Sequence, residues 1–214
     1  TLGEWKILSG GIKAELLRGL LEGLKHLHSL NIIHRDIKPG KYLQDELENV
    51  LLADSSSLSS IKIADFGLSA QLQQHQHANM RVQCGTLLYM APEVFSRPSY
   101  TKAVDIWACS VITYMLFNQG RHPFYKAGMS TNEFKICLQR DAFPLNVIIS
   151  SEFLIEASKK DYEQRYSVGE ALKHPWITRN LEDEVPLSIH ESYQGFDSTQ
   201  LIINDTFSDE DIEI

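Results

Sequence analysis

The sequence has few cysteines, no long apolar segment and no recognisable secretory signal. Its cysteines, Cys84, Cys109 and Cys137, are odd in number and lack the spacing of a metal site, so we expect reduced thiols in an intracellular protein. The longest nearly apolar run, 106–117, is shorter than the roughly 20 residues that span a bilayer. These features argue against a disulfide scaffold and a membrane span. They predict a soluble, cytoplasmic protein and a buried core helix at 106–117.

Basic residues are missing from the last part of the chain. All 20 Lys and Arg lie within residues 1–179, with 18 of the 28 acidic residues, whereas 180–214 holds the other 10 acids. We therefore predict one globular domain over 1–179 and an acidic, flexible tail over 180–214. A nucleic-acid-binding protein would need a basic patch, so we expect no nucleic-acid partner.

Apolar periodicity predicts a mostly helical fold with one small hairpin. The segment 13–29 has leucines at helical spacing and is predicted to be an amphipathic helix, followed by a turn at Asn31. Two short apolar runs, 49–52 and 61–64, are bounded by polar turn residues and are typical of short strands. We expect these two strands to pair as a hairpin.

Two short motifs flank this hairpin. Residues 34–39 are His-Arg-Asp-Ile-Lys-Pro, and residues 65–67 are Asp-Phe-Gly. In this order they resemble the catalytic loop and the metal-binding loop of protein kinases. Residues 84–93, Cys-Gly-Thr-Leu-Leu-Tyr-Met-Ala-Pro-Glu, are similar to the end of a kinase activation segment. The motifs at 120–124 and 172–177 most resemble the calcium/calmodulin-dependent group, so the chain resembles the C-terminal lobe of a eukaryotic serine/threonine kinase.

This resemblance implies transfer of the ATP γ-phosphoryl group to Ser or Thr hydroxyls of protein substrates, with Mg²⁺ as the metal. Asp36 would orient the substrate hydroxyl and accept its proton, and Lys38 would contact the transferred phosphate. Thr86 would contact both residues as the third catalytic group. Asp65 and Asn49 would hold the metal, and both would bind the nucleotide together with Lys38.

The resemblance also implies two structural contacts. Asp105 would hydrogen-bond the backbone of the His34–Arg35 loop. Glu93 would form a buried ion pair with Arg165, which is a contribution to stability and not to catalysis.

The sequence departs from the kinase pattern in two places. The residues before the predicted helix contain no glycine-rich loop, strand lysine or helix glutamate, so we expect the N-terminal lobe to be absent and ATP binding to be poor. Residues 40–47 are an insertion after Pro39, for which one hypothesis is a retained intron. Position for position, the metal-binding asparagine of the family falls on Lys41. With the insertion looped out it falls on Asn49, which we prefer because the expected strand follows it.

Phosphorylation in the activation segment is excluded over 70–85, which contains no Ser, Thr or Tyr. Calcium-binding loops and a basic calmodulin-binding helix are also missing, so the sequence identifies no regulator. Two functions remain open for this chain. The first is a serine/threonine kinase, and the alternative is a catalytically inactive, pseudokinase-like binding module.

Overall fold

The computed structural model describes residues 10–39, 49–52, 61–72, 84–96, 101–144 and 151–179. Lys41, the 40–47 insertion and the 180–214 tail lie outside these ranges, so what the sequence predicts for them stays a prediction. The helices are α1 (Gly10–Ser29), η2, a 3-10 helix (Leu87–Tyr89), α2 (Pro92–Ser96), α3 (Ala103–Phe117), α4 (Thr131–Arg140), α5 (Ser151–Ala157), α6 (Val168–Ala171) and α7 (Pro175–Arg179). The strands are β1 (Ile32–Ile33), β2 (Val50–Leu52), β3 (Ile61–Ile63) and β4 (Ala70–Gln71).

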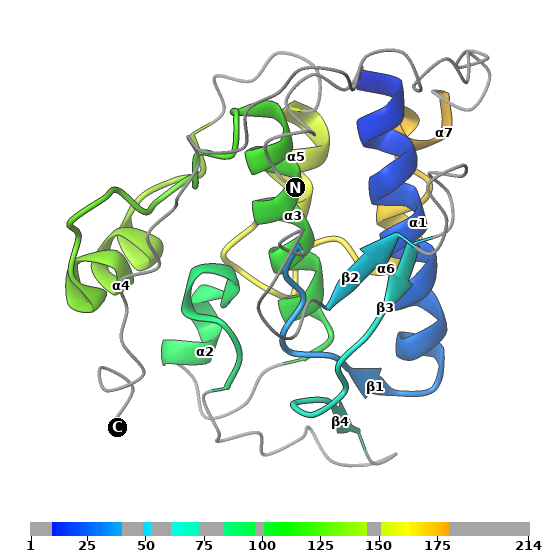
Figure 1. Ribbon diagram of the computed structural model, residues 1–214, viewed down its shortest axis with the longest axis horizontal. Coiled ribbons are helices and arrows are strands. Elements are labelled where there is room, and N and C mark those ends of the chain that lie inside the picture. Colours follow the sequence, from blue (N-terminus) through cyan, green and yellow to red (C-terminus); the bar gives the residue numbers. More distant parts are fainter. Residues whose placement is uncertain are drawn as a thin grey trace.

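Helices α1 and α3 form the centre of the fold, with α5, α6 and α7 packed around them (Figure 1). The predicted helix at 13–29 is confirmed and begins three residues earlier, at Gly10. Its leucine stripe is buried against α3, α6 and α7, and consists of Leu16, Leu17, Leu20, Leu21, Leu24 and Leu27. Amphipathic spacing places these side chains on one face, so burying them removes a continuous apolar surface from water.

Helix α3 is buried on all sides, as its nearly uniform apolar sequence predicts. Trp107 stacks on Phe124 and meets the edge of Phe143, which ties α3 to the segment before and after α4. Burial raises the pKa of the Cys109 thiol, and the nearby Asp105 charge adds to this. Cys84, Cys109 and Cys137, all within the described ranges, form no disulfide. Within the described ranges, every helix is too short or too polar to cross a bilayer.

The described strands form two antiparallel pairs, of which β2–β3 lies alongside α1 and β1–β4 lies near its C-terminal end (Figure 1). Strands β2 and β3 pair with Val50 opposite Ile63 and Leu52 opposite Ile61, which confirms the predicted hairpin. Strands β1 and β4 also pair, with Ile33 opposite Ala70. The sequence analysis did not predict this second pair, because two-residue strands are too short to give a periodic signal.

The predicted ion pair between Glu93 and Arg165 is present and buried. Arg165 donates to both carboxylate oxygens of Glu93, from Nη1 at 2.6 Å and from Nη2 at 2.9 Å. Arg165 also donates to the carbonyls of Ala103 and Lys159, and its guanidinium lies 5.0 Å from the Trp107 ring centroid. One buried cation thus connects α2, the start of α3 and the segment after α5.

Removing one partner of this pair should be strongly destabilising. Glu93→Ala leaves a buried guanidinium without its counter-charge, so we expect the free energy of unfolding to fall by about 3–5 kcal/mol. Urea unfolding followed by circular dichroism measures the change. Glu22→Ala is the matched control, because Glu22 and Lys25 form an exposed pair and such pairs contribute at most about 1 kcal/mol. Equal losses in the two variants would contradict the expectation.

His122 should make the stability depend on pH. Its Nε2 donates to the Leu88 carbonyl at 2.7 Å, while Nδ1 accepts from the backbone N–H groups of Phe124 and Tyr125 at 3.1 and 2.9 Å. Burial lowers the pKa of His122 from 6.5 to about 4. Between these two pH values the unfolded chain binds a proton at His122 and the folded chain does not. The contribution of neutral His122 to the free energy of unfolding is therefore complete above pH 6.5 and is lost as the pH falls toward 4.

We expect the free energy of unfolding to fall by up to about 3 kcal/mol as the pH falls from 6.5 toward 4. Urea unfolding at a series of pH values from 7.5 to 4.5 tests this, with His122→Asn as the comparison. The variant should be less stable at neutral pH and should show a flatter dependence on pH. An unchanged pH dependence in the variant would mean that His122 is not responsible.

Candidate active site

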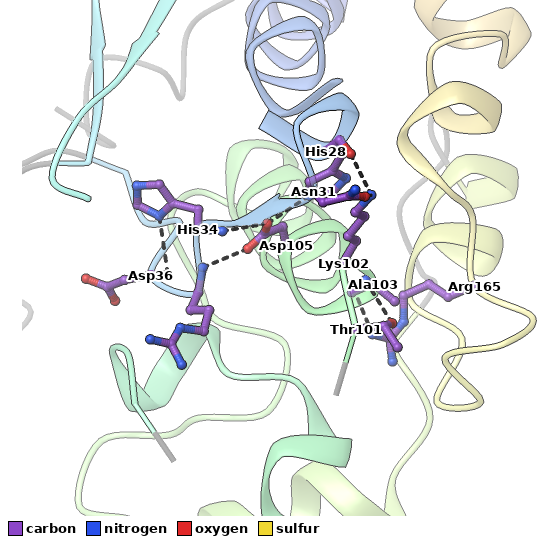
Figure 2. A network of polar contacts seen from close by, with 10 residues as sticks. His28, Asn31, His34, Asp36, Thr101, Lys102, Ala103, Asp105 and Arg165 are labelled. Atoms are coloured by element: carbon purple, nitrogen blue, oxygen red, sulfur yellow. Dashed lines mark hydrogen bonds and ion pairs between the residues drawn. The ribbon is translucent and has the colours of Figure 1, made fainter. Parts of the chain in front are cut away.

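The loop that carries Asp36 is held by the first turn of α3. Asp105, which is buried there, accepts from the His34 N–H at 3.0 Å through Oδ2 and from the Arg35 N–H at 2.9 Å through Oδ1 (Figure 2). His28 at the end of α1 contacts the same Oδ2 through Nε2, at 2.8 Å. Arg35 has a φ of 73°, a conformation that costs a non-glycine residue energy. The two bonds to Asp105 hold the backbone in this turn, as the sequence analysis expected.

Four donors surround the Asp36 carboxylate, which is buried. Oδ1 accepts from the N–H and the hydroxyl of Thr86, at 2.7 and 2.8 Å. Oδ2 accepts from Asn49 Nδ2 at 2.7 Å and lies 3.1 Å from Lys38 Nζ. Lys38 in turn donates to the Thr86 hydroxyl at 3.0 Å. Asp36, Lys38 and Thr86, named together from the sequence, therefore meet in one hydrogen-bonded cluster that also contains Asn49.

Asn49 is fully buried and joins the catalytic loop to the hairpin. Besides its bond to the Asp36 side chain, Nδ2 donates to the Asp36 carbonyl at 2.6 Å. The Asn49 carbonyl accepts from the Ala64 N–H at 2.8 Å, which extends the β2–β3 pairing to the residue before Asp65. These contacts fit the alignment in which residues 40–47 are looped out and Asn49 takes the family's asparagine position.

Asp65 occupies a tight turn directly after β3. Its φ is 56°, and its Oδ1 accepts from the Gly67 N–H at 3.0 Å. The turn is placed against the catalytic loop by His34, whose Nε2 lies 2.9 Å from the Ala64 carbonyl and whose ring meets Phe66 edge-on at 5.4 Å. The structure thus brings Asp65 to the same end of the hairpin as Asn49. The sequence analysis did not assign this linking role to His34.

The Arg35 side chain donates to the backbone carbonyls of Leu68 and Ser69, just beyond the Asp65 turn. The guanidinium therefore links the catalytic loop to the residues directly before 70–85, the segment that contains no Ser, Thr or Tyr.

Comparison with known proteins decides the family. A model of the protein kinase domain matches residues 5–177. The chain belongs to the protein kinase family.

Its relatives are serine/threonine kinases by name. The chain is 34% identical over 182 residues to the serine/threonine-protein kinase H1 homolog of Danio rerio, covering 83% of this chain and 41% of the relative. It is 36% identical over 172 residues to a calcium/calmodulin-dependent protein kinase type I of Schizosaccharomyces pombe, covering 77% and 48%. It is also 36% identical over 171 residues to serine/threonine-protein kinase PLK4 of Drosophila ananassae, covering 79% and 20%. The chain therefore spans between a fifth and a half of the length of these relatives.

Family membership confirms the resemblance drawn from the sequence, to serine/threonine kinases similar to the calcium/calmodulin-dependent group. The mostly helical kinase domain with little sheet is confirmed as well. Membership of the protein kinase family implies ATP as the nucleotide substrate. The individual roles of Asp36, Lys38, Thr86, Asn49 and Asp65 stay predictions, although the contacts expected among the first three are present.

Gly85 is a site residue that the sequence analysis did not single out. Its φ is 110°, and a Cβ on it would lie 2.4 Å from the Arg35 carbonyl oxygen and 3.6 Å from Asp36 Oδ1. Only glycine lets the Thr86 backbone approach the catalytic loop this closely. The Gly-Thr pair in the activation-segment motif was the available signal.

A side chain at position 85 should displace Thr86 from Asp36. We expect Gly85→Ala to lower the free energy of unfolding by about 2–4 kcal/mol, combining backbone strain with the steric conflict. Amide chemical shifts of Thr86 and Arg35 in nuclear magnetic resonance spectra should move as well. Gly120→Ala is the control, because Gly120 also has a positive φ, of 78°, but a Cβ there has no neighbour within 4 Å. An equal loss in both variants would show that strain alone matters.

Proposed function

We propose that this chain is the C-terminal lobe of a serine/threonine protein kinase, which transfers the γ-phosphoryl group of ATP to hydroxyls of protein substrates. The observation that carries this proposal is the buried Asp36 carboxylate, with a lysine, a threonine and an asparagine hydrogen-bonded to it. Phosphoryl transfer needs a carboxylate for the attacking hydroxyl and cationic groups for the phosphate, and this cluster contains both. The domain of residues 1–179 with a separate acidic tail belongs to the same proposal.

Asp36 would orient the substrate hydroxyl and accept its proton. As the hydroxyl oxygen bonds to the γ-phosphorus, the bond from that phosphorus to the β–γ bridging oxygen breaks, and ADP leaves with the electron pair. A carboxylate has about four acceptor sites, and four donors already lie around Asp36. The substrate hydroxyl must therefore replace one of them. The Thr86 hydroxyl suits this because it can rotate while the Thr86 N–H keeps its bond to Asp36.

Lys38 would bind the transferred phosphate. Its ammonium contacts both Asp36 and the Thr86 hydroxyl and is partly exposed, so it can reach a phosphate without leaving the cluster. An ammonium acts here as a point charge that compensates the negative charge on the γ-phosphoryl oxygens.

The residues fit a magnesium ion. Among the side chains that the structure describes, Asn49 Oδ1 is buried without a hydrogen-bond partner, although Nδ2 of the same amide makes two bonds. An amide oxygen and a carboxylate are ligands that Mg²⁺ accepts, so we infer that Asn49 and Asp65 hold the ion together with phosphate oxygens. The ion would neutralise phosphate charge during transfer. Leaving such an oxygen unpaired is costly, which gives a physical reason for a ligand there.

One observation favours the alternative function of a binding module without catalysis. The four donors around Asp36 occupy the acceptor positions of its carboxylate without any substrate, so the cluster is complete in the absence of a substrate hydroxyl. In that case the kinase fold would serve to bind partners, and neither Mg²⁺-ATP binding nor phosphoryl transfer would be measurable.

Transfer of labelled phosphate from Mg²⁺-ATP by the purified chain to a Ser/Thr peptide library tests the proposal. We expect Asp36→Asn to lower the rate by about 100-fold or more, since it removes the proton acceptor but keeps a similar shape. Asp141→Asn, which changes an exposed carboxylate far along the chain at the end of α4, should leave the rate unchanged. Calorimetric titration with Mg²⁺-ATP accompanies the assay. Absence of both binding and transfer would support the binding module, and transfer insensitive to Asp36→Asn would refute the assigned site.

A further inference from the structure

Lys102 stands at the start of α3 and reaches the turn between α1 and the catalytic loop. Its Nζ donates to the His28 carbonyl at 2.5 Å and to Asn31 Oδ1 at 2.7 Å (Figure 2). His28 and Asn31 bracket the end of α1, and only two residues of β1 separate Asn31 from His34. The lysine therefore acts where the chain changes from helix to catalytic loop.

A lysine is an unfavourable choice at this position. The N-terminus of a helix carries positive partial charge, which repels a cation. Helices α4 and α6 have Ser130 and Ser167 as N-caps, each in a capping box with a glutamate. At α3 the Lys102 side chain makes no cap hydrogen bond, and the Thr101 hydroxyl accepts from the Ala103 N–H at 3.3 Å instead. Burial also lowers the pKa of the Lys102 amine. Local conflicts of this kind are concentrated at functional sites, where another interaction compensates for them.

Two residues in the first turn of α3, Lys102 and Asp105, bind different parts of the chain that leads from α1 to the catalytic loop, and these contacts compensate for the unfavourable position of the lysine. Asp105, three residues after Lys102, accepts from the His34 and Arg35 N–H groups. Residues three apart share a helix face, so the first turn of α3 presents a cation and an anion to the same stretch of chain. Lys102 holds the beginning of that stretch through carbonyl and amide oxygens. Asp105 holds its end through N–H groups.

Asn31 also contacts the segment that follows the Asp65 turn. Its φ of 59° makes it the pivot of the turn, and its carbonyl accepts from the Leu72 N–H at 2.7 Å. Leu72 directly follows β4, which pairs with β1. A displacement of Asn31 would therefore move both the segment leading to Asp36 and the segment leading away from Asp65.

We propose that Lys102 is a positioning residue for phosphoryl transfer, which fixes the Asn31 turn and thereby the relative placement of the Asp36 loop and the Asp65 loop. Lys102 touches neither substrate nor nucleotide in this account. The inference rests on the proposed function for its catalytic consequence, but its structural consequence is independent of it.

The test uses four single variants of the full chain and the double variant that combines Lys102→Met with Asn31→Gly. Lys102→Met removes the ammonium and keeps the aliphatic stem, and Lys102→Arg keeps a cationic donor. Asn31→Gly removes the accepting amide but tolerates the positive φ, so it adds no backbone strain. Lys173→Met, an exposed lysine between α6 and α7, is the matched control.

Two readouts separate a positioning role from a general contribution to stability. Hydrogen exchange should become about tenfold faster at the His34, Arg35 and Leu72 amides in Lys102→Met, with exchange in the middle of α3 unchanged. The kcat for peptide phosphorylation should fall about tenfold while KM for Mg²⁺-ATP changes less than twofold, because a small displacement of reacting groups lowers the rate more than binding. Asn31→Gly should have the same effects, the double variant should add nothing further, and Lys102→Arg should retain most of the wild-type behaviour.

Each other outcome has a definite meaning. Exchange that accelerates uniformly over the core, or effects no larger than those of Lys173→Met, would overturn the proposal. Additive losses in the double variant would show that Lys102 and Asn31 act separately, which also overturns it. If the wild-type chain transfers no phosphate, the proposed function fails, and the exchange pattern at the three amides alone decides the role of Lys102.

Discussion

The buried carboxylate of Asp105 is the constraint on which the site depends. A catalytic loop needs a fixed backbone, yet Arg35, next to Asp36, has a positive φ angle that an isolated chain would avoid. Asp105 compensates for this by accepting from two consecutive N–H groups, while His28 contacts the same carboxylate. Charge-assisted hydrogen bonds of this kind are about twice as strong as neutral ones. Helix α3, which is buried from Val104 to Leu116, therefore determines where the loop lies.

The same principle extends through the site as a chain of backbone contacts. His34 links the catalytic loop to Ala64, Asn49 links it to the hairpin, and Gly85 lets the activation segment approach. In the first two cases hydrogen bonds to main-chain groups join the segments, and at Gly85 the absence of a side chain lets two backbones approach, so the relative position of the loops follows from their backbones. Catalytic groups need placement to within a fraction of an ångström, which backbone contacts provide better than contacts between long, mobile side chains.

Much of this arrangement could be predicted from the sequence. The leucine spacing gave the long helix, and the kinase-like motifs gave the Asp105 contacts, the Glu93–Arg165 pair and the meeting of Asp36 with Thr86. Other features have no such signal. The β1–β4 pair is too short for periodicity, and Lys102 looks like any polar residue before a helix. The burial of His122 and its hydrogen bond to the Leu88 carbonyl depend on a segment distant in the sequence.

The sequence by itself determined the long first helix, the buried core helix and the hairpin, and which side chains carry charge and hydrogen-bonding groups, because periodicity and residue chemistry are local properties. Only the tertiary structure decided which groups surround each of these side chains. It gave Asn49 an unpaired buried oxygen beside Asp36, gave Lys102 its contacts with the Asn31 turn, and shifted the pKa of His122. These properties depend on burial and on groups brought together from distant segments, so they arise only when the whole core has packed.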